Sequence, residues 1–178
     1  MHSEVIEFWF EEISEAQWWK KDDDFDRILI ERFSELHHAA SQCELYTWRE
    51  TPEGRLAEII VLDQFSRNMF RDTPKAFAQD GLALALAQEA VSVGADKELE
   101  VKKRSFLYMP YMHSESKAIH EVAEKLFEEN TSESSHHFEL RHKAIIDRFG
   151  RYPHRNAILG RESTNEEIEF LKQPGSGF

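Results

Sequence analysis

Residues 148–156 hold the densest group of side chains that could recognise a small molecule. Arg148, Arg155, His154 and Asn156 fall within nine positions, and Gly150 and Pro153 break any helix there. Guanidinium groups bind carboxylates and phosphates through two parallel hydrogen bonds, and an asparagine amide adds a donor and an acceptor. The composition of this stretch therefore predicts a loop that binds a small anionic group.

A second candidate group lies at residues 63–68. Asp63 and Arg67 are four positions apart, on the same stripe of a predicted helix as Ile59, and Asn68 follows directly. A charged pair on a largely apolar face is costly unless its members are well hydrogen-bonded. The pair is either a salt bridge that fixes a helix corner or the polar wall of a pocket. Because Asn68 adds a further polar group, the second interpretation is preferred.

Histidines supply the candidates for proton transfer. His113 and Glu115 end a run of apolar and aromatic residues just before a predicted helix, and His142 falls on the apolar face of a later helix. An imidazole can act as a general acid or base near neutral pH, so His113 and His142 are the candidate catalytic residues. The alternatives are that Glu115 only complements a helix dipole and that His142 is a satisfied core histidine.

The sequence gives less support for a metal site or for a catalytic nucleophile. The spacing Glu-x-x-His can place two metal ligands on one helix face, but about one such match is expected by chance in this composition. Cys43 is the only cysteine, and the sequence contains no Gly-rich phosphate loop or nucleophile elbow. We therefore predict no metal site and leave any cofactor unassigned. The spacing occurs at Glu35/His38, Glu133/His136 and Glu139/His142.

The charge distribution narrows the classes of partner. The chain of 178 residues has a net charge of −12, although residues 141–161 contain six basic residues and a single acid. An acidic protein is a poor match for nucleic acid, whereas a local basic group suits a small anion. The alternative is that these arginines pair with the abundant glutamates. No stretch is long and apolar enough to predict a membrane span, and the sequence favours a cytoplasmic protein.

Apolar residues recur at helical spacing along the chain, and no segment shows the alternation of a strand. Start signals occur at Thr51-Pro52 and Thr164, and Gly94 and Gly150 are typical helix ends. Pro110 is predicted to stop the helix that begins near Glu98. The sequence thus predicts an all-α fold of helical hairpins in a single domain over residues 1–178.

Three separated stretches, residues 62–80, 106–115 and 142–171, together resemble a bacterial family of unknown function, DUF924. Ser66 stands where the family usually has proline, and Tyr152 where phenylalanine is common. The resemblance implies a tetratricopeptide-like fold of packed antiparallel helical hairpins. It implies no activity, and the repeat consensus of peptide-binding tetratricopeptide arrays is not visible.

Two classes of function follow. In the first, hairpins bring the three groups around one concavity that binds, and can transform, a small anionic molecule. In the second, the chain is a helical protein–protein interaction module whose polar cluster is a structural network. A metal-binding helical protein is the third and weakest alternative. The predicted ligand-binding residues are Asp63, Arg67, Asn68, His113, Glu115, His142, Arg148, His154, Arg155 and Asn156.

Overall fold

The computed structural model describes residues 2–178, and within that range the chain is helical and contains no strand. The all-α prediction is confirmed. No helix of the described residues is long and apolar enough to cross a membrane. The α-helices are α1 (His2–Glu7), α2 (Asp23–Ser41), α3 (Pro52–Ile60), α4 (Ser66–Met69), α5 (Asp80–Ser92), α6 (Val101–Met112), α7 (Lys117–Asn130), α8 (Glu133–Phe149), α9 (Asn156–Leu159) and α10 (Asn165–Leu171).

Shorter helical turns join or extend these helices. Single π-helical turns cover Phe8–Glu12 and Val61–Phe65, and the second of them links α3 to α4 without a break. A π-helical turn inserts one extra residue into the helix and is frequent at functional sites. The 3₁₀ turns are Glu15–Trp18, Tyr46–Glu50, Pro74–Phe77, Ala95–Glu98 and Pro153–Arg155.

Most predicted helix ends are where the sequence places them, for recognisable local reasons. Thr51 caps α3 by accepting a hydrogen bond from the Gly54 amide, and Thr164 forms a capping box with Glu167 at α10. Gly150 ends α8 in the left-handed conformation, with φ of 71°. The predicted stop at Pro110 is wrong. Its ring is accommodated inside the last turns of α6, which continues to Met112.

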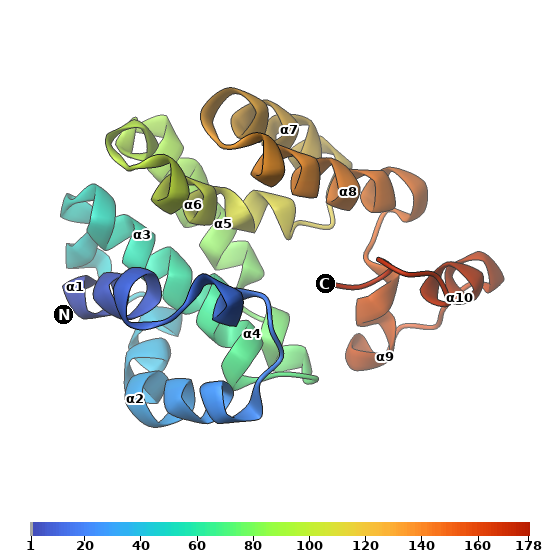
Figure 1. Cartoon of the computed structure of the whole chain (residues 1–178), viewed down its shortest axis with the longest axis horizontal. Helices are drawn as coiled ribbons and strands as arrows, with labels where there is room; N and C mark the ends of the chain where they lie inside the picture. The colour runs from blue at the N-terminus through green and yellow to red at the C-terminus, as the bar shows by residue number, and fades with distance from the viewer. Residues whose placement is uncertain (1) are drawn as a thin grey trace.

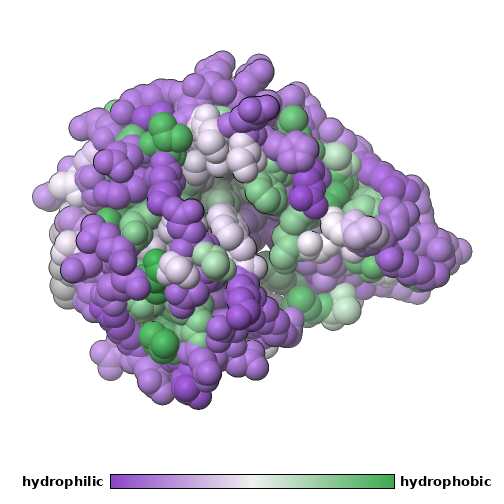
Figure 2. All heavy atoms as spheres, viewed as in Figure 1, coloured by the Kyte–Doolittle hydropathy of each residue, from purple (hydrophilic) through white to green (hydrophobic). Residues whose placement is uncertain are grey.

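The helices form two regions joined at the end of α8 (Figure 1). The helical body, residues 2–149, holds one continuous apolar cluster that extends from Val5 in α1 to Phe127 in α7. The C-terminal segment, residues 150–178, contributes Tyr152 to a much smaller cluster with Ile145 and Ile146 of α8. Figure 2 shows a hollow on the viewed face between these two regions.

Helices adjacent in sequence pack as neighbours in the later part of the body. Thr131 and Ser132 alone separate α7 from α8, and these helices lie against each other as a hairpin (Figure 1). The tetratricopeptide-like order of the hairpins stays a prediction from the family resemblance. The fold positions the end of α6. This end points toward the C-terminal segment and carries His113 to the boundary between the two regions.

Candidate functional site

A cavity of about 360 Å³ lies where the start of α5, the end of α6 and the C-terminal segment meet. Its apolar walls come from proline, phenylalanine and leucine side chains, and four charged or titratable side chains enter between them. Apolar walls with a few convergent polar groups are typical of small-molecule sites. The cavity is lined by Pro74, Phe77, Ala78, Asp80, Gly81, Leu84, Pro110, His113, Ser114, Glu115, Arg155 and Leu159.

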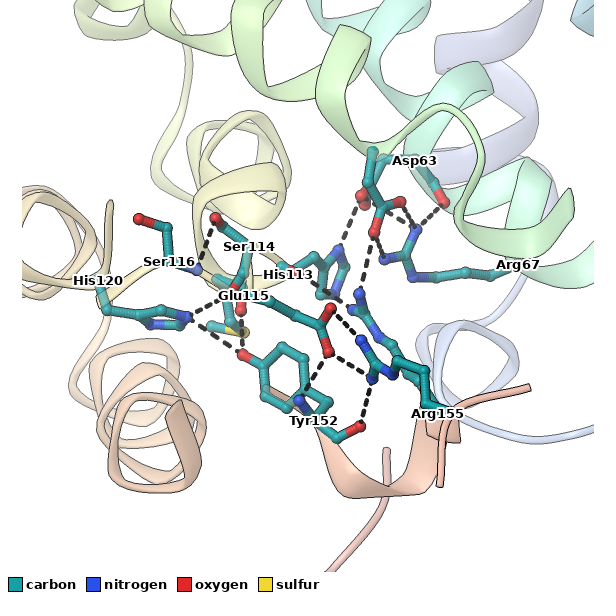
Figure 3. Close-up of polar contacts among 12 residues, drawn as sticks. Asp63, Arg67, His113, Ser114, Glu115, Ser116, His120, Tyr152 and Arg155 are labelled. Atoms are coloured by element: carbon teal, nitrogen blue, oxygen red, sulfur yellow. Dashed lines mark hydrogen bonds and ion pairs between the residues drawn. The ribbon is translucent and has the colours of Figure 1, made fainter. Parts of the chain in front are cut away.

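Asp63 holds His113 in a fixed orientation beside this cavity. Asp63 is fully buried in the π-helical turn, and its Oδ1 lies 2.8 Å from Nδ1 of His113 (Figure 3). The Gln64 amide donates to the other carboxylate oxygen at 2.6 Å. Among the described residues Nε2 of His113 has no hydrogen-bond partner. The carboxylate therefore fixes the tautomer with the proton on Nδ1 and leaves Nε2 as an acceptor.

The electrostatics of this pair favour a carboxylate beside a neutral imidazole. Burial raises the pKa of Asp63, but the charge of Arg67 and the hydrogen bonds from His113 and Gln64 outweigh burial and hold it well below its usual range. Burial, and then the positive charge of Arg67, lower the pKa of His113. A neutral imidazole oriented by a carboxylate can accept a proton from a bound molecule.

Two arginines share one carboxylate on the cavity wall. Arg67 donates to both oxygens of Asp80, at 3.0 and 3.1 Å, and also lies 3.2 Å from Oδ1 of Asp63. Arg155 reaches Asp80 from the C-terminal segment at 3.3 Å and donates to the His113 carbonyl at 3.0 Å. One carboxylate thus serves two guanidinium groups, and Arg67 makes the shorter contacts with it.

Arg155 is the less satisfied of these two cations. The side chain is buried, with the residue 6% exposed, and its guanidinium lies over the rings of Phe77 and Tyr152 at 4.4 and 4.7 Å. Its buried Nε–H has no acceptor in the described part of the chain. Burial, and then the charge of Arg67, lower its pKa. A buried donor without an acceptor is costly, so this side chain gains from an acceptor brought by a ligand.

Glu115 fastens the C-terminal segment to the end of α6. Its carboxylate accepts two hydrogen bonds from Arg161, at 2.7 and 2.8 Å, and one from the Tyr152 amide at 2.7 Å. Burial raises the pKa of Glu115, but these hydrogen bonds and the nearby Arg155 outweigh burial and lower it. Glu115 therefore forms one wall of the cavity and anchors the segment that carries Arg155 (Figure 3).

His142 and His154 lie beside Tyr152 rather than on the cavity wall. The His142 ring is 6.4 Å from the His113 ring, and its Nδ1 donates to the Phe138 carbonyl at 2.7 Å. Burial lowers the pKa of His142 to about 3 and, together with the charge of Arg155, that of His154 to about 4. Both side chains are neutral near pH 7.

The remaining three predicted residues point elsewhere. Asn68 donates to Asp26 of α2 at 2.8 Å, and Arg148 is exposed and pairs with Glu166 at 2.8 Å. Asn156 is buried inside the C-terminal segment, where it accepts from Arg161 and donates to Ser163 and Glu167. The structure thus brings Asp63, Arg67, His113, Glu115 and Arg155 together and leaves these three outside the cavity.

The basic group at residues 141–161 is largely neutralised by acidic partners. Arg148 pairs with Glu166, Arg151 with Glu167, and Arg161 with Glu115. These pairings agree with the alternative interpretation, in which the arginines form ion pairs with the abundant glutamates. Arg155 differs because its carboxylate partner, Asp80, is already engaged by Arg67.

Several residues that line the cavity or hold its walls in place were absent from the predicted set. Asp80 begins α5, where a carboxylate usually complements the helix dipole, so its position alone gave no functional signal. Arg161 and Tyr152 lie in the basic stretch, but their contacts to Glu115 join positions 46 and 37 residues apart. The apolar walls carried no signal distinct from ordinary core residues.

The Glu-x-x-His pairs do not form a metal centre in the described part of the chain. Glu139 accepts from His120 at 2.6 Å, whereas His142, its partner in the motif, donates to a backbone carbonyl. No group of three histidine, cysteine, aspartate or glutamate side chains within residues 2–178 is placed to hold a metal ion.

Fold and site together define an all-helical protein with a polar-lined cavity at the junction of a helical body and a C-terminal segment. The chain belongs to the family described as bacterial protein of unknown function, DUF924, which matches residues 5–175. It is similar to the solved structure of a protein of unknown function from Agrobacterium tumefaciens, at 37% identity over 96% of both chains with a TM-score of 0.91. No curated protein matches the chain.

Proposed function

We propose that this protein binds a small anionic molecule in the cavity between α5, α6 and the C-terminal segment. The observation that carries the proposal is Arg155, a buried cation on the cavity wall with an N–H that lacks an acceptor among residues 2–178. A carboxylate or phosphate oxygen would supply that acceptor and would balance a guanidinium that shares its carboxylate partner, Asp80, with Arg67.

The rest of the cavity agrees with a ligand of modest size. A volume of about 360 Å³ lies at the lower end of the range for small-molecule pockets. Phe77, Leu84 and Leu159 offer apolar contacts, and His113 offers a hydrogen-bond acceptor through Nε2. If the ligand is transformed, His113 is the residue that accepts a proton, and Asp63 stabilises the imidazolium that results.

The proposal is tested by anion-dependent thermal stabilisation in matched arginine variants. Inorganic phosphate and acetate are titrated against the wild type, Arg155→Gln and Arg148→Gln, with sodium chloride at equal ionic strength as the reference. Arg148 is the control because it comes from the same stretch and is exposed. We expect a saturable rise in melting temperature in the wild type and in Arg148→Gln, and none in Arg155→Gln.

Two outcomes would contradict the proposal. Equal stabilisation of all three proteins would mean that the anions act through the general surface. A large fall in melting temperature for Arg155→Gln, with no anion effect in the wild type, would favour the interpretation of the cluster as a structural network.

A further inference from the structure

The tail, residues 173–178, places an aromatic ring beside the histidines of the site. The Phe178 ring stacks on His142 with centroids 3.7 Å apart and an interplanar angle of 19°. Tyr152 and His154 meet the same ring edge-on, at 6.1 and 5.8 Å. Three aromatic side chains therefore form a slot that fits one planar ring, and we call it the ring slot.

The ring slot is built into the protein, whereas its occupant is loosely held. His142 and Tyr152 are 5% and 1% exposed, but Phe178 keeps 54% of its surface in water. Among the described residues, the hydrogen bond that holds residues 174–178 runs from the Ser176 hydroxyl to the Leu171 carbonyl, within the C-terminal segment itself. The contact of the tail with the slot thus depends mainly on stacking, which contributes modestly.

The ring slot adjoins the anion cavity through shared residues. His113 lines the cavity and lies 6.4 Å from His142, which forms the base of the slot. Tyr152 contacts both sites, because the Arg155 guanidinium lies over its ring at 4.7 Å while Phe178 meets it edge-on. The ring slot and the anion cavity are therefore neighbours that share Tyr152.

We propose that the ligand of this protein combines an anionic group with a planar ring, and that its ring displaces Phe178 from the slot. This inference rests on the proposed function, since Arg155 receives the anionic group. Phe178 then occupies the slot in the ligand-free protein, and a ligand must compete with it. A planar ring is favoured over an aliphatic chain because the flat face of His142 is the contact surface.

Three matched probes separate the two parts of such a ligand. 3-Phenylpropionate carries both a ring and a carboxylate, propionate carries the carboxylate alone, and 3-phenyl-1-propanol carries the ring without charge. Each is titrated into the wild type and Phe178→Ala, and binding is followed by the histidine C–H resonances in NMR. Phe178 is half exposed, so its removal is expected to leave the fold intact, which circular dichroism checks.

Because the competing ring is lost, Phe178→Ala is expected to bind both phenyl probes with an affinity roughly two- to tenfold higher than the wild type does. Propionate should bind the two proteins equally, and the saturating shifts of the phenyl probes should be largest at His142. In Phe178→Ala the further change His142→Ala should remove the gain. In the wild type, 3-phenylpropionate should also shift the His142 resonances as Phe178 leaves.

Unchanged or weaker phenyl binding in Phe178→Ala would overturn this inference. If propionate nevertheless binds in an Arg155-dependent way, the anion site stands and the ring slot alone fails. If propionate binds neither protein while 3-phenyl-1-propanol binds Phe178→Ala more tightly than the wild type, the ring slot stands and the proposed anion function fails.

Discussion

The helical body and the C-terminal segment are held together by different forces. In the body, apolar and aromatic side chains from α1 to α7 form one buried cluster, with Phe65 in contact with Phe8, Trp9 and Phe33. The segment buries a small cluster around Tyr152 and is also attached by charged hydrogen bonds through Arg155 and Arg161. The cavity lies where the two kinds of attachment meet.

The two regions offer different groups to a ligand. Non-directional apolar burial fills the core of the body, whereas an attachment made by charges places hydrogen-bond donors and acceptors at the boundary. Arg155 holds the segment and also lines the cavity. Arg155 therefore both docks the segment and is the group that we propose binds an anion.

The largest effect should come from the body. Phe65→Ala removes a fully buried ring and is expected to lower the free energy of unfolding by ~3–5 kcal/mol, because it loses apolar burial and leaves a cavity. Urea denaturation measures this change. Val122→Ala, at an exposed position of α7, is the control and should change stability by less than ~0.5 kcal/mol. A loss below ~1 kcal/mol at Phe65 would argue against one continuous core.

A smaller and more local effect is expected at the boundary. Glu115→Gln removes the charge that Arg161 and the Tyr152 amide share, at a site about a quarter exposed, and should cost ~1–3 kcal/mol. Hydrogen exchange should rise in residues 150–178 and stay near the wild-type level in α1–α5. An equal rise throughout the chain would show that the two regions open as one unit.

Acid should weaken the boundary through its buried histidines. The pKa values of His142 and His154 fall from about 6.5 to about 3 and 4 on folding, so the unfolded chain binds more protons below pH 6.5. The contribution of the two neutral imidazoles to the free energy of unfolding is complete above pH 6.5 and is lost as the pH falls toward the folded-state pKa values. We expect a loss of roughly 1–2 kcal/mol per histidine between pH 6.5 and 5.

Thermal unfolding across this pH range checks the expectation, with His142→Gln and His154→Gln compared with the wild type. Each variant should show a shallower decline. The matched control is His38→Gln, an exposed position at the end of α2, which should keep the wild-type pH dependence. Identical slopes for the site variants and the wild type would mean that these imidazoles are not buried as neutral groups.

The sequence was sufficient to predict much of the fold. The helical periodicity and the caps at Thr51 and Thr164 act over a few residues, so they can be recognised locally. The stop predicted at Pro110 failed because α6 continues to Met112 although proline lacks a backbone N–H, and the residues around it, 105–112, are buried.

The types of residue in the candidate site could be predicted from the sequence better than the particular residues that form it. Asp63, His113 and Arg155 stood out as polar groups among apolar ones. The position of Asp80 on the cavity wall and the exposure of Arg148 were not predictable in this way. Both depend on contacts between distant segments, which spacing along one helix does not encode. Phe178 gave no signal either, because its stacking on His142 follows from the path of the tail.

The most direct test of this account is the Nε–H resonance of Arg155 in a ¹⁵N-resolved NMR titration with acetate. We predict a saturable shift of that resonance, because acetate supplies the acceptor that the buried donor lacks among the described residues. The Nε–H of Arg148 should move only with ionic strength. An Arg155 resonance that does not shift, or that shifts in parallel with Arg148 and never saturates, would contradict it.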